Sequence, residues 1–195
     1  MMPAIDHSND HLEEDIKRLR NKYYCPAAID PKSMPAVPPD PASGVRRIAV
    51  IRRMQKEGRT DVWLAERDGH FAGLAATINS EDAILLDYFA VAKRLRGQGM
   101  GSAFLQALLD KYAGKGLFVE IEAADQDDPS GEKQLRKQFY LRNGLEDMHV
   151  TVILFGVRME LLGRGCDLDF DGYREFYRTH YNPWEAEHVV RPEGD

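Results

Sequence analysis

The residues with the clearest chemical potential form a glycine-rich loop, Arg96-Gly97-Gln98-Gly99-Met100-Gly101. Apolar spacing predicts a strand that ends near Ala92 before the loop and a helix that starts near Ser102 after it. Glycines let a backbone approach an anion closely, and the first turn of a helix offers unpaired N–H groups with a partial positive charge. Lys93 and Arg94 add cationic charge just upstream. The loop therefore predicts an anion site suited to a phosphate or pyrophosphate.

The spacing argues against two common nucleotide-binding motifs. The loop does not end in the Gly-Lys-Ser/Thr of a Walker A motif, and Ser102 stands where the dinucleotide fingerprint requires its last glycine. Glu120 and Glu122 nevertheless stand on the next predicted strand, roughly where an acid binds the ribose of a dinucleotide. A nicotinamide or other nucleotide cofactor is therefore the alternative, and a purely structural tight turn is another.

The stretch from Leu86 to Ser102 resembles the signature of the GNAT acetyltransferases. That signature is a strand, then Arg/Gln-x-x-Gly-x-Gly/Ala, then a helix, and Arg96, Gly99 and Gly101 match its fixed positions. The resemblance extends over about residues 60–162, with similarities to a bacterial subgroup in the predicted helix at 45–56 and in the tail at 169–184. It does not include the first 44 residues, where only Pro3-Ala4-Ile5 could serve as the family's opening strand.

A second motif lies downstream of the loop. Phe139-Tyr140-Leu141-Arg142-Asn143-Gly144-Leu145 resembles the family's Phe-Tyr-x-x-x-Gly-Phe element, with Leu145 in place of the usual phenylalanine. A predicted helix and a predicted strand separate the two motifs, as in the family. Together the motifs are much more specific than either one alone.

The resemblance implies acetyl-CoA as the co-substrate, without a metal. In the family, backbone N–H groups of the loop hold the CoA pyrophosphate, and the preceding strand pairs its backbone with the pantetheine arm. The thioester would then lie where that strand splays from the strand at 117–123. The implied cofactor-binding residues are Phe89, Ala90, Val91, Arg96, Gly97, Gln98, Gly99, Met100, Gly101 and Ser102.

Direct attack of an amine on the thioester carbonyl needs a neutral amine and a proton for the leaving thiolate. Tyr140 occupies the family's tyrosine position, where its hydroxyl can protonate the CoA sulfur; simple packing of an amphipathic side chain is the alternative. Asp87, Glu120 and Glu122 are carboxylates on the strands that line the expected cleft, and repulsion between the two glutamates could raise one pKa. The catalytic candidates are Tyr140, Glu122 and Asp87, with solvated carboxylates and a water relay as the alternatives.

Elements on both sides of the loop indicate an α/β fold. Strand patterns around the Asp68-Gly69 turn predict a meander before the loop, and strands alternate with helices after it. This order predicts a mixed α/β sheet with helices on both faces, and the resemblance implies that this central sheet is GNAT-like and mostly antiparallel. The predicted strands span residues 62–66, 70–78, 83–92, 117–123, 150–155 and 158–162, and the predicted helices span 11–24, 45–56, 102–112, 132–142 and 169–181.

The 195 residues fit a single acetyltransferase domain, 1–195, with a divergent N-terminal helix and proline-rich connector in 1–44 and the core in 45–195. The net charge of −6 argues against a general nucleic-acid binder. No apolar run approaches the roughly 20 residues of a membrane helix, and the N-terminus lacks the apolar centre of a secretory signal. We therefore expect a cytoplasmic protein that binds neither nucleic acid nor membranes.

These observations predict an N-acetyltransferase that moves an acetyl group from acetyl-CoA to a primary amine of a small molecule or peptide. A non-catalytic acyl-CoA-binding regulator is an alternative from another class, and a nucleotide-dependent oxidoreductase is a third. The six histidines form no recognisable ligand set. One aromatic stripe at helical spacing indicates core or interface packing, with a substrate wall or a homodimer contact as the alternatives; it consists of Tyr173, Phe176, Tyr177 and Tyr181.

Overall fold

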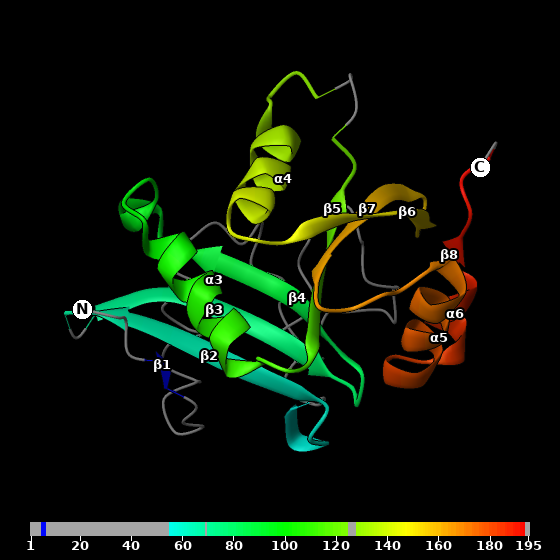
Figure 1. Ribbon diagram of the computed structural model, residues 1–195, viewed down its shortest axis with the longest axis horizontal. Helices are drawn as coiled ribbons and strands as arrows, with labels where there is room; N and C mark the ends of the chain where they lie inside the picture. The colour runs from blue at the N-terminus through cyan, green and yellow to red at the C-terminus, as the bar shows by residue number, and fades with distance from the viewer. Residues whose placement is uncertain (1–4, 7–54, 69, 125–127, 194–195) are drawn as a thin grey trace, which may run out of the picture.

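The computed structural model describes residues 5–6, 55–68, 70–124 and 128–193, and its centre is an eight-stranded sheet in the order β1-β2-β3-β4-β5-β7-β6-β8 (Figure 1). This mixed α/β sheet confirms the predicted fold class. The strands are β1 (Ile5–Asp6), β2 (Thr60–Arg67), β3 (His70–Asn79), β4 (Ala83–Val91), β5 (Gly116–Glu122), β6 (Glu146–Leu154), β7 (Val157–Arg164) and β8 (Val189–Val190). The helices are the 3₁₀ helix η2 (Lys93–Leu95) and the α-helices α3 (Met100–Lys111), α4 (Glu132–Arg142), α5 (Phe170–His180) and α6 (Pro183–Glu187).

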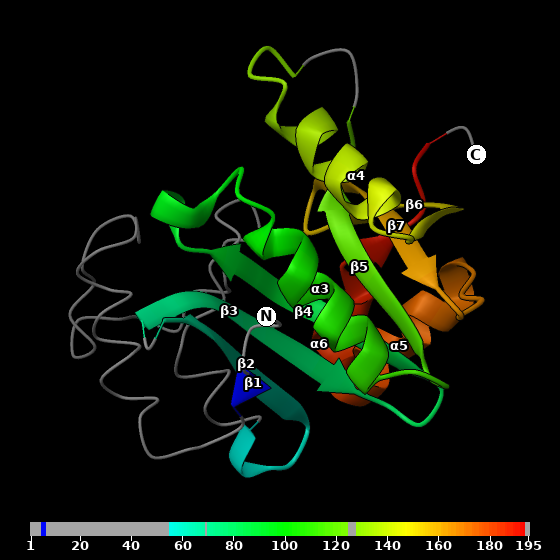
Figure 2. The same cartoon turned by 60° about the vertical axis from the view of Figure 1, so that its left-hand side comes forward.

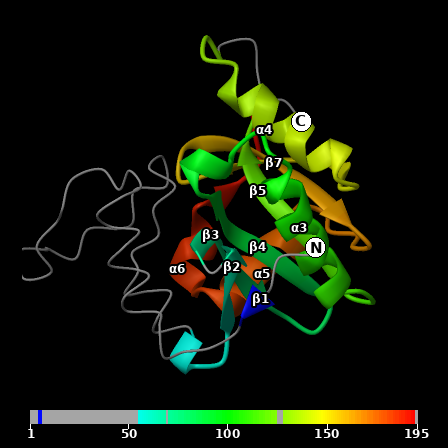
Figure 3. The same ribbon diagram turned by 90° about the vertical axis from the view of Figure 1, so that its left-hand side faces the viewer.

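The predicted meander is present as β2, β3 and β4, which pair antiparallel in sequence order. Asp68 has a φ of 55° in the tight turn between β2 and β3, a conformation that Asp adopts more readily than most residues. The short strand β1 pairs antiparallel with β2 at the outer edge of the sheet (Figure 3). Its Ile5 belongs to the short segment that was the only candidate for an opening strand.

Two hydrophobic clusters lie on opposite faces of the sheet. One is built around α3 and α4 and includes Phe104, Leu108 and Tyr140. The other is built around α5 and α6 and includes Tyr173 and Tyr177. Figure 2 shows α3 in front of the strands and α5 and α6 behind them. The helices therefore cover both faces, as the order of elements predicted, and the stripe on α5 is mainly a core face.

Strand β5 contributes side chains to both clusters because successive residues of a strand point to opposite faces. Leu117, Val119 and Ile121 belong to the cluster under α3 and α4. Phe118 belongs to the cluster under α5. The predicted alternation of this strand is therefore confirmed, and it assigns Glu120 to the α5 face.

Several element boundaries differ from the predictions. Helix α3 begins at Met100, two residues before the predicted start at Ser102, because Gly99 adopts the left-handed conformation and is its N-cap. Helix α6 and strand β8 were not predicted, since each is too short to show a period. The predicted helix at 11–24 and the proline-rich connector lie outside the described residues. Of the predicted helix at 45–56, only residues 55 and 56 are described.

Candidate active site

Strands β4 and β5 open a gap in the middle of the sheet. They pair in parallel only at their starts, where Ala83–Leu85 faces Gly116–Phe118. Among the described strands this is the one parallel pair. The register of β4 against β3 slips at Asp87, which is the extra residue of a bulge. Because a bulge bends its strand, β4 turns away from β5 beyond this point, as predicted for the place of the thioester.

The backbone of β4 has an edge that faces this gap. Ala92 N–H donates to Ala72 O on β3 at 2.8 Å. A Cβ placed on Gly73 would lie 2.8 Å from Ala90 O, so that carbonyl also faces β3. Since main-chain groups alternate between the two edges of a strand, those of Phe89 and Val91 face away from β3. A third extended chain could pair with β4 along this edge.

The glycine loop leads directly into α3 with the geometry of an anion site. Gly97 and Gly99 have φ values of 73° and 78°, which non-glycine residues rarely adopt. A Cβ on either residue would meet nothing within 4 Å. The N–H groups of the first helical turn come before the first intrahelical bond, from Ala103 N–H to Gly99 O at 3.0 Å. Backbone donors, a helix N-terminus and open space therefore meet here.

Side chains next to the loop fix its shape. Arg96 Nε donates to Val91 O at 3.3 Å, and Arg94 donates from its guanidinium to Phe71 O at 2.7 Å. Gln98 Nε2 donates to Arg94 O at 2.8 Å. Lys93, Arg94 and Arg96 are exposed, so their positive charge surrounds the start of α3. These contacts bind the loop to β3 and β4 and make its surroundings cationic.

Helix α4 packs against the loop at Gly101. A Cβ on Gly101 would lie 3.3 Å from the Phe139 ring, so only glycine fits without displacing that ring. The Phe139 ring stacks against Phe89 of β4 with 6.0 Å between centroids, and Phe89 packs on Phe104 of α3 at 5.2 Å. The two sequence motifs thus meet in one apolar contact between Gly101 and Phe139, which lie 38 positions apart in the chain.

Tyr140 lies on the same face, next to Phe139 on α4. Its side chain is 7% exposed, and its ring makes an edge contact with the Phe139 ring at 5.2 Å. Burial raises the pKa of Tyr140 to about 12, although the charge of Arg136 lowers it. The hydroxyl is therefore protonated at neutral pH and can act as a proton donor.

The three candidate carboxylates have different surroundings. Asp87 Oδ1 accepts a hydrogen bond from Tyr181 OH at 3.1 Å. Glu120 accepts hydrogen bonds from Tyr173 OH and from Tyr177 OH of α5, the latter at 2.9 Å to each carboxylate oxygen. Glu122 Oε2 lies 3.6 Å from Lys133 Nζ of α4, and both side chains are about one-third exposed. The structure thus places all three on the strands that splay but gives only Asp87 and Glu120 tyrosine partners on α5.

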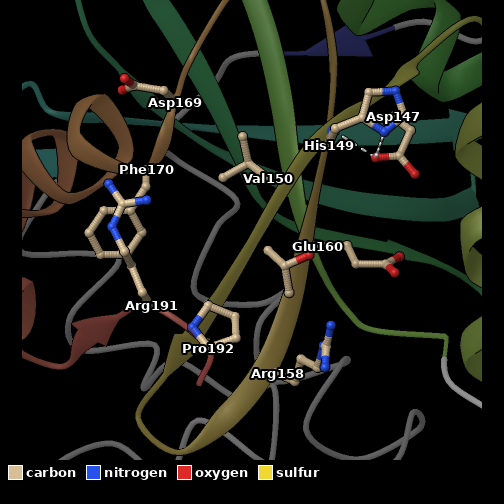
Figure 4. Close-up of a pocket in the computed structure, with 10 residues that line it drawn as sticks. Asp147, His149, Val150, Arg158, Glu160, Asp169, Phe170, Arg191 and Pro192 are labelled. Atoms are coloured by element: carbon tan, nitrogen blue, oxygen red, sulfur yellow. Dashed lines mark hydrogen bonds and ion pairs between the residues drawn. The ribbon is translucent and has the colours of Figure 1, made fainter. Parts of the chain in front are cut away.

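A separate hollow lies on the far part of the sheet (Figure 4). Its volume is about 510 Å³, and its walls come from β6, β7, the start of α5 and the C-terminal segment. Asp147, His149, Arg158 and Glu160 lie on one side of it, and Arg191 lies on the other. None of the residues predicted for cofactor binding or catalysis lines this hollow, and its mixed charges were not recognised from the sequence.

Two features are absent from the described ranges. No group of three or more His, Cys, Asp or Glu side chains there could hold a metal ion. None of the helices there combines the length and hydropathy that a membrane span requires.

The sequence matches a family and a curated relative over about half its length. Residues 43–134 match the family model described as "Acetyltransferase (GNAT) domain". YjbC of Bacillus subtilis (strain 168), whose name describes it as an acetyltransferase, is 33% identical over 102 residues. That match covers 52% of this chain and 50% of YjbC, so the chain matches only about half the length of this curated relative.

Solved structures share the fold over most of the chain. A GNAT-family structure from Bacteroides thetaiotaomicron superposes with a TM-score of 0.66 at 16% identity, covering 91% of this chain and 98% of that one. Arabidopsis thaliana Naa50, in complex with the bisubstrate analogue CoA-Ac-MVNAL, superposes with a TM-score of 0.52 at 16% identity, covering 84% and 99%. Residues 43–134 are thus similar to a GNAT acetyltransferase domain, and the chain shares the fold of a GNAT-family structure.

Proposed function

We propose that this protein transfers an acetyl group from acetyl-CoA to a primary amine by direct attack. The observation that carries the proposal is the junction of the glycine loop, the α3 N-terminus and the edge of β4 beside a gap in the sheet. The family match favours CoA over the nicotinamide cofactor that Glu120 and Glu122 had suggested. The Naa50 complex, whose ligand joins CoA to a peptide, shows both substrates of that relative in one fold.

The proposed cofactor site uses main-chain groups and positive charge. Residues 96–102 hold the pyrophosphate through the N–H groups of the loop and the first turn of α3. The pantetheine arm pairs with the backbone of Phe89 and Val91 along the edge of β4, as a strand added to a sheet, and Ala90 lies between these two residues with its main-chain groups toward β3. Phe139 and Phe89 form an apolar wall next to this edge. The acetyl group would then lie in the gap between β4 and β5.

In the proposed reaction, the amine nitrogen attacks the thioester carbonyl carbon and the carbon–sulfur bond breaks. Tyr140 donates its hydroxyl proton to the departing thiolate and regains a proton from solvent. Asp87 or Glu122, directly or through water, accepts the proton that the attacking amine loses. The products are an acetamide and CoA with a free thiol, and every proton is accounted for.

The acceptor is a primary amine of a small molecule or a peptide. Fold alone does not choose between these classes, since one fold carries sites for many substrates. A panel that contains lysine amide, spermidine and short peptides with free N-termini, assayed by release of the CoA thiol, separates them. Acetyl-CoA binding without release of thiol on any amine would favour the regulator that binds acyl-CoA without turnover.

Calorimetric titration with acetyl-CoA tests the cofactor site. We expect the double variant Gly97→Ala/Gly99→Ala to lose affinity by at least about tenfold, because Cβ atoms and altered backbone torsions disturb the anion cradle. The matched control is Gly58→Ala/Gly114→Ala, since those glycines have φ values of 70° and 91° and equally open surroundings. Each substitution costs about 1–2 kcal/mol of stability.

The control variant distinguishes the general effect of backbone strain at glycines with positive φ from a loss of contacts with acetyl-CoA in the loop. Equal loss of affinity in both double variants would mean that the loop has no special role. A wild-type protein that is folded but fails to bind acetyl-CoA would refute the proposed function, and parallel titration with NAD would then test the nucleotide alternative.

A further inference from the structure

Helix α4 ends with an arginine that lies close to the anion site. The guanidinium carbon of Arg142, the last residue of α4, lies over the Phe139 ring at 5.4 Å from its centroid. The same ring would lie 3.3 Å from a Cβ on Gly101, in the first turn of α3. One aromatic ring therefore contacts both the Arg142 guanidinium and the helical turn that carries backbone donors of the loop.

The Phe139 ring is itself held by rings that reach into the core. It stacks against Phe89 with 6.0 Å between centroids, and Phe89 packs on Phe104, which is 0% exposed, at 5.2 Å. A guanidinium on an aromatic ring uses its flat face for that contact, so the N–H groups at its edge stay available. Arg142 thus presents its donors from a supported position at the surface.

Arg142 differs from the arginines of the loop because its donors are uncommitted. Arg94 already donates to Phe71 O, and Arg96 donates to Val91 O. Within the part of the chain that the structure describes, Arg142 is exposed, donates to no carbonyl and pairs with no carboxylate. Its place at the C-terminus of α4 favours a positive charge through the helix dipole, but the dipole alone does not require a guanidinium on the Phe139 ring.

CoA carries two kinds of phosphate. The diphosphate in the middle of the molecule is the group that the proposed function assigns to the main-chain donors of the loop. The ribose carries a phosphate monoester, whose charge of about −1.5 to −2 at pH 7 and several oxygens suit a bidentate contact with a guanidinium. Since the pantetheine arm occupies the edge of β4, the nucleoside end leaves the loop toward solvent, where Arg142 is exposed beside the first turn of α3.

We propose that Arg142 binds the ribose 3′-phosphate of CoA, and that this contact makes the site select CoA over 3′-dephospho-CoA. This assignment rests on the proposed acetyl-CoA site and adds one binding residue and a selectivity to it. Arg142 would contact a part of the cofactor far from the reacting carbonyl, so it contributes to binding and not to the chemical step. Lys93, which is also exposed near the loop, supplies positive charge without a planar set of donors.

Calorimetric titration of the full-length protein with CoA and with 3′-dephospho-CoA measures this selectivity as the ratio of the two Kd values. In the wild-type protein, the Kd for 3′-dephospho-CoA should be about tenfold higher or more, because a charge-assisted bidentate contact is lost. Arg142→Gln should bring the two Kd values within about twofold of each other, mainly by raising the Kd for CoA. Arg142→Lys keeps the charge but not the planar donors, so its ratio should be intermediate.

Two control variants remove a positive charge elsewhere. Arg136→Gln changes another exposed arginine of α4, and Lys93→Gln changes a cation next to the loop. Each should preserve the wild-type ratio, since a general loss of positive charge weakens the binding of both ligands. If Arg142 only supports Phe139 or the end of α4, Arg142→Gln raises both Kd values equally; an unchanged ratio in that variant therefore overturns the proposal.

Titration of the same samples with acetyl-CoA keeps the two proposals separate. A folded wild-type protein that binds neither acetyl-CoA nor CoA refutes the proposed function. Normal binding of acetyl-CoA, together with equal Kd values for CoA and 3′-dephospho-CoA, refutes the role of Arg142 alone. Selectivity that is lost in Lys93→Gln but kept in Arg142→Gln also overturns the proposal, because it assigns the 3′-phosphate to Lys93.

Discussion

Tyr140 combines a sequence position and an environment that favour the same role. Its side chain is almost fully buried beside Phe139, and burial raises its pKa to about 12. The protonated form of the hydroxyl therefore dominates over the whole physiological range, which a proton donor requires.

Tyr140→Phe should lower kcat by roughly a hundredfold or more and leave acetyl-CoA affinity nearly unchanged, since only the proton donor is lost. In the wild-type protein, kcat should rise with pH as the amine deprotonates, with no falling limb up to about pH 10, because the donor titrates far above that range. The measurement is kcat against pH for both proteins. A falling limb near neutral pH, or an unchanged kcat in the variant, would contradict this role.

The three carboxylates were located by the sequence, but their surroundings were not predicted from it. The sequence placed Asp87, Glu120 and Glu122 on the right strands but could not rank them, because the partners of Asp87 and Glu120 come from segments far away in the chain. Lys133 lies 11 positions from Glu122, whereas Tyr177 lies 57 positions from Glu120. Helical spacing revealed the aromatic stripe on α5, but nothing in that spacing indicated that its hydroxyls would reach the splaying strands.

At the scale of elements, α3 and α4 must stay fixed for Gly101 and Phe139 to stay in contact. At its C-terminal end, α3 is anchored by Tyr112 OH, which contacts Thr77 Oγ1 at 2.8 Å and Trp63 Nε1 at 3.1 Å. Helix α4 is anchored by Lys137 Nζ, which lies 2.9 Å from Asp147 Oδ2 and 2.8 Å from Glu160 Oε2. These polar contacts bind each helix to different strands of the sheet.

Lys137→Met should reduce the free energy of unfolding by about 1 kcal/mol at pH 7, since it breaks two partly buried ion pairs. Burial raises the pKa of Asp147, but hydrogen bonds from Lys137 and from His149 N–H outweigh it and hold that pKa below its ordinary value. The stabilisation from Asp147 is therefore full above its unfolded pKa and is lost as the pH falls through the lower folded value. Urea unfolding of both proteins at several pH values measures the difference in their free energies of unfolding.

The difference between Lys137→Met and wild type should accordingly shrink below about pH 4. Lys133→Met is the control, because its one pairing with Glu122 is longer and more exposed. A difference that does not change with pH would show that α4 is held by apolar packing instead of by these charges.

At the scale of the whole molecule, the sheet separates two groups of side chains. The α3–α4 face carries Phe139 and Tyr140, whereas the α5 face carries the tyrosines that donate to Glu120 and Asp87. The gap between β4 and β5 lies between the two faces of the sheet. Since β5 contributes alternate side chains to both hydrophobic clusters, anything that orders the gap should stabilise both faces together.

Acetyl-CoA at about 100 times its Kd should stabilise the folded protein by about 2.7 kcal/mol, which for a chain of this size raises Tm by roughly 5–10 °C. Differential scanning calorimetry should show one transition that shifts as a unit. Gly97→Ala/Gly99→Ala should lose most of this shift, and Gly58→Ala/Gly114→Ala should keep it. Two separate transitions, only one of which responds to the ligand, would contradict the coupling of the two faces.

The sequence by itself determined most of the described elements and the position of the glycine loop, because these depend on local spacing. Alternation gave the meander and the faces of β5, and the glycines at 97, 99 and 101 marked the loop before α3. Tertiary structure decided what those elements do together. It set the splay of β4 from β5 and the contact of Phe139 with Gly101. It also set the hydrogen bonds from Tyr177 to Glu120 and from Tyr181 to Asp87, which join residues distant in the chain. Local periodicity carries no information about such contacts, since it sets which face of an element is apolar but not which partner covers that face.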